Sequence, residues 1–184
     1  EPHVTLDHTG YFEADELRRK IESRGLSVSS LCPENVVYPW QYAARKPLHA
    51  QRSLAYFKHG IELAEVLGAP YMSINSGWGD WDEDREEAWK RSAEHLAILA
   101  DYAGEHGVTL CMESLRPEES NLVVTLADAR RMLDQVASPH LTPMVDTTAM
   151  GVAGESLEEW FAEFGDGAIR NMRFIDGAPY GHLV

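Results

Sequence analysis

Positive charge and cysteine are both scarce in this sequence, and each shortage excludes a class of protein. The 184 residues include 16 lysines and arginines against 30 aspartates and glutamates, which gives a formal net charge of -14. A protein whose affinity comes from neutralising phosphates needs the opposite sign, so we expect no nucleic acid partner. The two cysteines, Cys32 and Cys111, have neither zinc-type spacing nor the density of a disulfide scaffold, and we expect buried, reduced thiols.

Long apolar runs are also missing from the sequence. No segment approaches the length that a membrane helix needs, and no basic leader precedes a signal-type apolar core. We therefore expect no membrane association and a cytoplasmic location. The chain is long enough to bury one sizeable core, and we interpret residues 1–184 as one domain.

Segments with helical and with strand-like patterns alternate along the chain. Helices are expected over residues 13–24, 47–67 and 89–103, and further helices begin at the Thr125 and Ser156 caps. Strands are expected at residues 26–31, 71–76, 108–113, 141–147 and 169–176. The first seven residues carry no lead-in strand, and the chain closes in what reads as a loop. Helical crossovers of this length require parallel strands, in an open doubly wound sheet or an eight-stranded barrel.

The polar residues favour the barrel. Neither GxGxxG nor GxxxxGK[ST] follows a strand, which removes the usual reason to choose a nucleotide-binding sheet. Polar chemistry instead follows strand after strand, and a barrel builds its site at that end of every strand. The sequence therefore predicts a (β/α)8 TIM barrel that is incomplete, lacking strand one, most of strand two and all of strand eight. Its open sheet edges predict a homo-oligomer.

Two acidic residues close apolar strands and are the first candidates for chemistry. Glu113 ends the strand that begins at Val108, and Asp146 ends the strand that begins at Leu141. Buried carboxylates are costly unless they are paired or bound to a metal, so we expect both to face one pocket and share a divalent ion. The alternative is that either acid caps a helix or pairs with an arginine such as Arg116.

Three further residues are candidates for the substrate site. His3 and His182 fall in segments that follow strands, so barrel geometry alone places them near the same end of the fold. Trp78 follows another strand, and flat aromatic rings suit the C–H faces of a sugar. Trp78 is equally compatible with a packing role or an oligomer contact.

Four stretches carry a resemblance to a known family: MESLRPEESN, MVDTTAM, GESLEEWFAEFGD and FIDGAPYGHL. Together they resemble the sugar-phosphate isomerase/epimerase superfamily of xylose-isomerase-like barrels, and within it the fructoselysine 3-epimerases and ketose 3-epimerases. The resemblance implies a divalent metal, Mn²⁺, Mg²⁺ or Co²⁺, held by two glutamates, an aspartate and a histidine. It implies that Glu113 is a metal ligand and an acid/base, that Asp146 is a second ligand, and that Glu119 contacts the substrate.

The chain also departs from this pattern. Arg173 stands where relatives place the histidine ligand, and an arginine cannot ligate a metal. The expected fourth ligand, a glutamate on the last strand, is not in the sequence. The resemblance implies an isomerase that epimerises C3 of a ketose or fructosamine-type sugar through a metal-stabilised enediolate. One alternative is a non-catalytic sugar-binding subunit, in which Arg173 holds an anionic substrate or pairs with Asp146; another is a C-glycoside-cleaving or dehydratase relative.

Overall fold

The structure is a computed structural model that describes residues 1–6, 10, 12–34, 40–178 and 181–182, the side chains of residues 178, 181 and 182 excepted. Its elements in chain order are β1 (His3–Val4), α1 (Ala14–Glu22), β2 (Ser30–Pro33), α2 (Pro47–Leu67), β3 (Tyr71–Ile74), α3 (Arg85–Glu105), β4 (Thr109–Glu113), α4 (Leu126–Val136), β5 (Leu141–Asp146), α5 (Thr147–Val152), α6 (Leu157–Phe164), β6 (Asn171–Arg173), β7 (Gly177–Ala178) and β8 (Gly181–His182).

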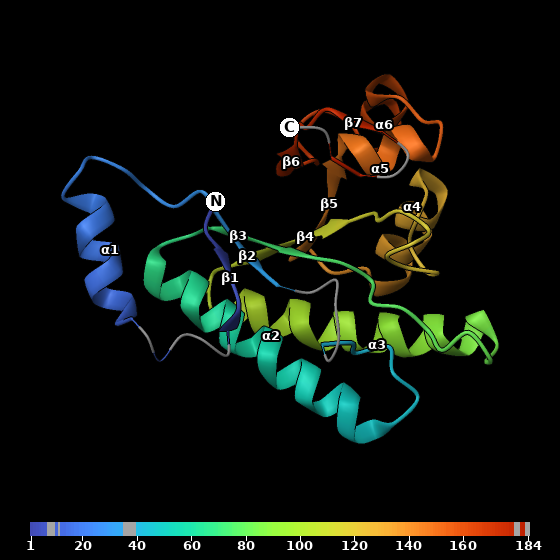
Figure 1. Ribbon diagram of the computed structural model, residues 1–184, viewed down its shortest axis with the longest axis horizontal. Helices are drawn as coiled ribbons and strands as arrows, with labels where there is room; N and C mark the ends of the chain where they lie inside the picture. Colours follow the sequence, from blue (N-terminus) through green and yellow to red (C-terminus); the bar gives the residue numbers. More distant parts are fainter. Residues whose placement is uncertain (7–9, 11, 35–39, 179–180, 183–184) are drawn as a thin grey trace.

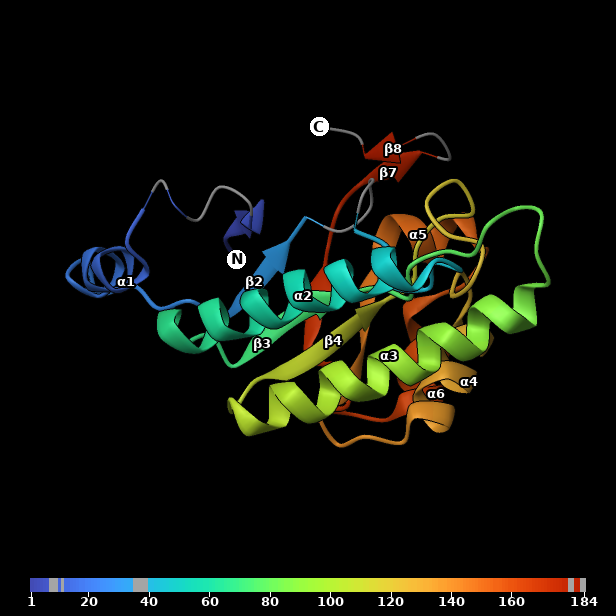
Figure 2. The same ribbon diagram turned by 90° about the horizontal axis from the view of Figure 1, so that it is seen from below.

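The first six strands form one parallel sheet in sequence order, β1 to β6 (Figure 1). β7 and β8 form a separate antiparallel pair. The long helices α2 and α3 pack against each other and lie along one face of the sheet (Figure 2). A curved parallel sheet with its crossover helices on the outside is a partial TIM barrel, as the sequence predicts.

The core lies between the sheet and these helices. Alternate residues of the strands point outward into it, and they are apolar: Leu31, Met72, Ile74, Leu110, Met112 and Val145 are all fully buried. Phe57 and Ile61 from α2 and Leu96 and Leu99 from α3 complete the layer. Burial of this apolar surface is the main stabilising contribution to the half-barrel.

The opposite, concave face of the sheet has a different composition. Because successive strand residues point to opposite faces, the partners of the core residues point inward, and many of them are polar. The polar members of this inward set include Ser30, Cys32, Ser73, Cys111, Glu113, Asp146, Asn171 and Arg173. This face is therefore hydrophilic, and a barrel enzyme builds its site where such strands end, at their carboxyl-terminal side.

The expected helix ends are confirmed where caps predict them. Thr125 accepts a hydrogen bond from the backbone N–H of Asp128, and Ser156 forms a capping box with Glu159. Gly68 ends α2 in the left-handed conformation at φ 71°, which glycine adopts without strain. No described helix is long and apolar enough to cross a bilayer.

Several expected elements differ from the structure. The strand predicted at residues 26–31 begins only at Ser30, because pairing with β3 starts there and Leu26 is 61% exposed. The opening residues do contain a strand, β1, which pairs with β2. Its two residues are too few to give a recognisable strand pattern in the sequence. The strand predicted at 169–176 is limited to Asn171–Arg173, and β7 and β8 lie where a loop was expected.

Candidate functional site

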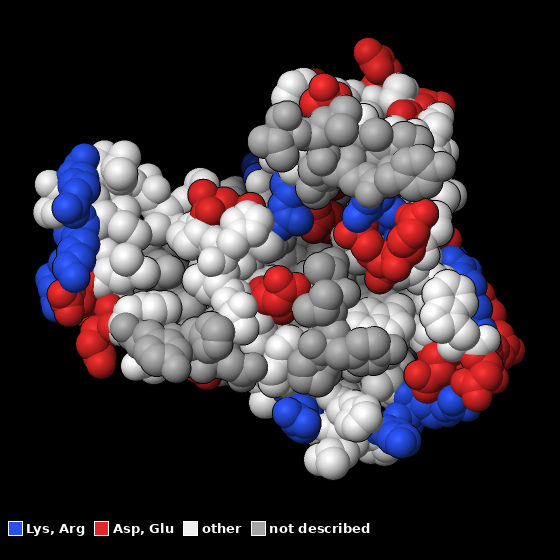
Figure 3. All heavy atoms as spheres, viewed as in Figure 1, with Lys and Arg blue, Asp and Glu red and all other residues white. Residues whose placement is uncertain are grey.

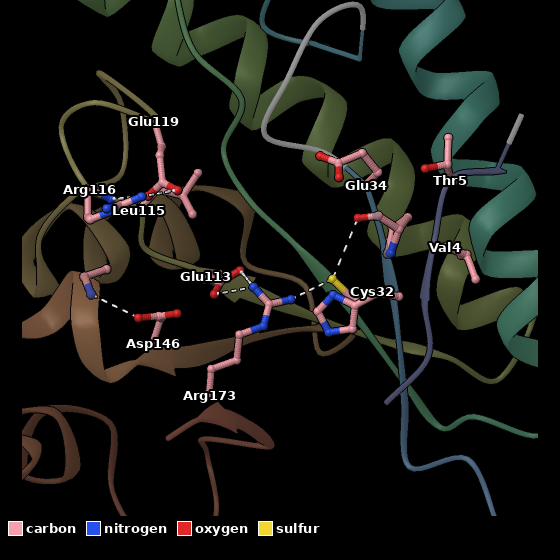
Figure 4. A pocket seen from close by; sticks show the side chains of 13 residues that line it. Val4, Thr5, Cys32, Glu34, Glu113, Leu115, Arg116, Glu119, Asp146 and Arg173 are labelled. Carbon is pink, nitrogen blue, oxygen red and sulfur yellow. Dashed lines mark hydrogen bonds and ion pairs between the residues drawn. The ribbon is translucent and has the colours of Figure 1, made fainter. Parts of the chain in front are cut away.

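A cavity of about 380 Å³ opens at the carboxyl ends of the strands. Its walls come from five strands and the segments that follow them, and they include His3, Cys32, Glu113, Asp146 and Arg173 (Figure 4). The two acids predicted to face one pocket therefore do line the same cavity. In Figure 3, acidic and basic atoms lie side by side in the hollow between the N-terminal strands and the part of the chain after β5.

Glu113 ends β4 and is almost completely buried, with 3% of its surface exposed. Both of its carboxylate oxygens accept hydrogen bonds from Nη1 of Arg173, at 2.7 Å for Oε1 and 2.6 Å for Oε2. The alternative expectation, that this acid pairs with an arginine, is therefore confirmed for Glu113. The partner is Arg173 and not Arg116. A charged pair is the arrangement that makes a buried carboxylate tolerable.

Asp146 ends β5 and is 5% exposed. Its Oδ1 accepts hydrogen bonds from the backbone N–H groups of Thr148 at 2.7 Å and Ala149 at 3.0 Å. It is thus the N-cap of α5, a short helix that the sequence analysis did not expect. Capping uses one carboxylate oxygen. The contacts described for Asp146 include no hydrogen bond or ion pair with Arg173, which was one of the expected alternatives, although its charge raises the pKa of Arg173.

Arg173 connects three strands across the interior. From β6 it reaches Glu113 on β4, donates from Nη2 to Sγ of Cys32 on β2 at 2.6 Å, and lies 3.5 Å from Oγ of Ser73 on β3. Its Nε lies 3.7 Å from a carboxylate oxygen of Glu1. Arg173 therefore occupies the position at which relatives are expected to carry a histidine ligand. Its guanidinium contacts Glu113, Glu1 and the thiol of Cys32.

The electrostatics of this cluster follow from its burial. The pKa of Glu113 is raised to about 7 in total: burial is the largest cause, Arg173 acts to lower the value, and the nearby Asp146 acts to raise it. Burial alone lowers the pKa of Arg173, but Glu113 and its other neighbours raise it above its usual value. The guanidinium stays charged, and Glu113 can gain or lose a proton near neutral pH.

Glu119 lies in the loop after β4 and also lines the cavity. It pairs with Arg116 through two parallel hydrogen bonds of 2.9 Å, from Nε to Oε2 and from Nη2 to Oε1. Such a two-point contact fixes both side chains. The predicted role of Glu119 in substrate contact is compatible with its position and stays a prediction.

Of the three remaining candidate residues, one lines the cavity. His3 lines it from β1, and its Nε2 lies 3.2 Å from a carboxylate oxygen of Glu1. Trp78 is half-buried in the segment after β3 and is not among the described residues that line the cavity. His182 lies in β8, and its side chain is outside the described part of the structure.

Two residues of this cluster, Cys32 and Glu1, were not predicted to be site residues. Cys32 was expected to be a buried thiol, and it is a free, buried cysteine, but its sulfur also accepts the hydrogen bond from Arg173. Glu1 contacts Ser30 and Asn171 from the start of the chain. Polar residues at alternate positions of β2 and β6 could have indicated that Cys32 faces the site. The two strands have only four and three residues, which is too short for the alternation to be recognised.

A match to a known protein family shows which family this chain belongs to. Residues 3–181 match the family described as xylose isomerase-like TIM barrel. The chain belongs to this family. The expected resemblance and the fold class are therefore confirmed.

Relatives of this xylose isomerase-like chain include sugar epimerases. It is 29% identical over 171 residues to fructoselysine 3-epimerase of Shigella flexneri, which covers 92% of the chain and 62% of the relative. The same enzyme of Escherichia coli O157:H7 is 28% identical over the same length, with the same coverage of 92% and 62%. The chain thus spans less than two thirds of the length of these relatives.

Solved structures show the same fold. A D-psicose 3-epimerase structure determined in the presence of D-fructose matches with a TM-score of 0.78 and 16% identity, covering 92% of this chain and 61% of the other. A structure of L-ribulose 3-epimerase matches with a TM-score of 0.77 and 24% identity, covering 86% and 53%. At these identities the likeness establishes the fold.

Enzymes of the xylose isomerase-like family are typically metal-dependent, so the donor set must be compared with what a metal needs. Divalent ions of this kind require several free oxygen or nitrogen donors around one point. Both oxygens of Glu113 accept from a guanidinium, and one oxygen of Asp146 caps α5. Among the described residues, only Glu1, His3 and Cys32 bring three donor atoms within 4.8 Å of one another. The predicted Glu113 and Asp146 site, as arranged here, does not fit a metal.

Proposed function

We propose that this chain binds an unphosphorylated ketose or fructosamine-type sugar in the cavity and that Glu113 transfers the proton at C3. The observation that carries the proposal is a buried carboxylate at the cavity wall whose pKa burial raises to about 7. General acid/base catalysis is most effective when the pKa lies near the working pH. Membership of a family that includes sugar epimerases supports the same reaction class.

The charges that line the cavity favour an uncharged sugar over a sugar phosphate. Arg116 and Arg173 are paired with Glu119 and Glu113, and His3 lies beside Glu1. Recognition of a phosphate normally uses arginine or lysine donors that are available to it. The described lining therefore offers hydrogen bonds to hydroxyl groups and no unpaired arginine or lysine for a phosphate.

The proposed step moves one proton and no heavy atom. The ionised Glu113 takes the proton from C3, the C3–H electron pair becomes the double bond of an enediolate, and the negative charge falls on the ketone oxygen at C2. Return of a proton to the other face of C3 inverts its configuration, and return to the same face restores the substrate. Solvent exchange at C3 is therefore the primary readout, because it requires only the first half of the reaction.

A second function is favoured by one specific contact. Because Arg173 donates to both oxygens of Glu113, the base is already neutralised in this arrangement. A chain that keeps this pair when ligand is bound is a sugar-binding subunit without turnover. The two functions differ in whether Glu113 leaves Arg173 when the sugar enters.

Proton NMR of ketoses in deuterated water tests the proposal. We expect the C3–H signal of D-fructose, D-tagatose or fructoselysine to disappear in the presence of the chain, faster than in buffer alone. Binding without exchange, measured by titration calorimetry on the same sugars, supports the sugar-binding subunit. Neither binding nor exchange with any of the three sugars overturns both functions.

A further inference from the structure

The side chain of Arg173 is held in the interior by contacts with two other strands and with the first residue of the chain. Glu113 on β4 accepts two hydrogen bonds from it, Cys32 on β2 accepts one, and Glu1 lies within ion-pair distance of Nε. Only 19% of the Arg173 side chain is exposed. A residue fixed by this many partners has a defined position in the cavity and is not a mobile surface arginine.

This position coincides with the donors that a metal would use. Glu113 belongs to the predicted metal pair, whereas Cys32 and Glu1 belong to the other group of converging donors, together with His3. The guanidinium contacts a member of each group. An incoming divalent ion would have to displace Arg173 from these partners or lie next to a permanent positive charge in a poorly solvated site.

We infer that Arg173 is the built-in cation of this cavity: it takes the place of a divalent ion beside Glu113, and the protein binds its sugar without a metal. The guanidinium supplies the positive charge that balances Glu113 in the resting protein. When Glu113 removes a proton, the same charge lies close to the developing enediolate. The role toward sugar rests on the proposed function, whereas the exclusion of a metal does not.

One donor of Arg173 remains unused in this arrangement. Its Nε is buried and makes no hydrogen bond, and the Glu1 carboxylate is 3.7 Å away. An unsatisfied buried N–H is costly, and because this atom has no exposed surface, a ligand oxygen could accept from it only after the Arg173 side chain shifts. A sugar hydroxyl or an enediolate oxygen has the required chemistry.

Metal content and manganese titration test the inference without reference to activity. The chain is dialysed against MnCl₂, freed of loose metal and analysed by inductively coupled plasma mass spectrometry, and Mn²⁺ is titrated into the metal-free protein by calorimetry. We expect less than about one tenth of an ion per chain and no saturable heat at micromolar Mn²⁺. Arg173→His removes the charge and restores a ligand, and we expect it to bind about one ion per chain.

Two comparisons make the result specific to this side chain. Arg19→His alters an exposed arginine of α1 and should leave the protein without bound manganese. Arg173→Met removes the charge without adding a ligand and should bind manganese more weakly than Arg173→His, which shows what the histidine contributes. One tightly bound Mn²⁺ in the unaltered chain would overturn the inference, and so would a folded Arg173→His chain that binds none. The first result is decisive even if both Arg173 variants fail to fold.

Sugar binding in EDTA separates this inference from the proposed function. We expect the same affinity for ketoses with EDTA and with added Mn²⁺. A chain that binds sugar only with Mn²⁺ refutes the inference and leaves the proposed function intact. A chain that holds neither metal nor sugar refutes the proposed function, while its metal content still supports Arg173 as the group that excludes the ion.

Discussion

Replacing Glu113 with glutamine is expected to slow C3 proton exchange by a factor of about 10² to 10⁴. Glutamine keeps the size of the side chain and can still accept a hydrogen bond from Arg173, but it cannot take a proton from carbon at neutral pH. The exchange rate is followed by the loss of the C3–H signal in deuterated water, with sugar concentrations above and below saturation. Because shape is preserved, sugar affinity should change far less than the rate.

The matched comparison for this substitution is Glu118→Gln. Glu118 is an exposed acid in the same loop as Glu119, so its replacement makes the same chemical change outside the cavity. We expect exchange at the rate of the unaltered chain. If Glu113→Gln exchanges the C3 proton as fast as Glu118→Gln, Glu113 is not the base and the proposed step is wrong.

The stability of the chain should fall as the pH rises from about 4.5 to about 7, by on the order of 3 kcal/mol from Glu113 alone. Burial raises the pKa of Glu113 from 4.5 to about 7 in the folded protein. Within this window the folded protein keeps a proton that the unfolded chain has already released. The stabilisation that this proton provides is fully present below pH 4.5, the pKa of Glu113 in the unfolded chain. It is lost as the pH rises through about 7, the pKa of Glu113 in the folded protein.

Urea unfolding at half-unit steps of pH measures this effect. The free energy of unfolding of Glu113→Gln is expected to lose most of the decline between pH 4.5 and 7, because glutamine does not titrate in that range. Glu118→Gln should keep the decline of the unaltered chain. Parallel curves for the unaltered chain and Glu113→Gln would show that Glu113 is ionised throughout and that Arg173 outweighs burial.

Much of the fold could be predicted from local sequence signals because those signals act over a few residues. The apolar stripe of α2, its Pro47 start and its Gly68 end specify the helix without reference to the rest of the chain. The capping box of α6 is equally local. In contrast, β1 and β6 are short and depend on pairing with β2 and β5, so their limits depend on the sheet as a whole.

The candidate site could be predicted only in part for the same reason. Barrel topology brings Glu113 and Asp146 to one cavity, which strand order alone implies. Which group neutralises each acid depends on contacts between distant segments. Arg173 is 60 residues from Glu113 in sequence, and the cap that Asp146 provides depends on α5, which has too few residues for a periodic apolar pattern.

Crystals of the chain grown with excess Mn²⁺ and measured at the manganese absorption edge test the central claim most directly. The account predicts no anomalous peak between Glu113 and Asp146, and it predicts Nη1 of Arg173 within hydrogen-bond distance of both Glu113 oxygens. A peak coordinated by these two carboxylates, with Arg173 turned away from Glu113, would contradict it.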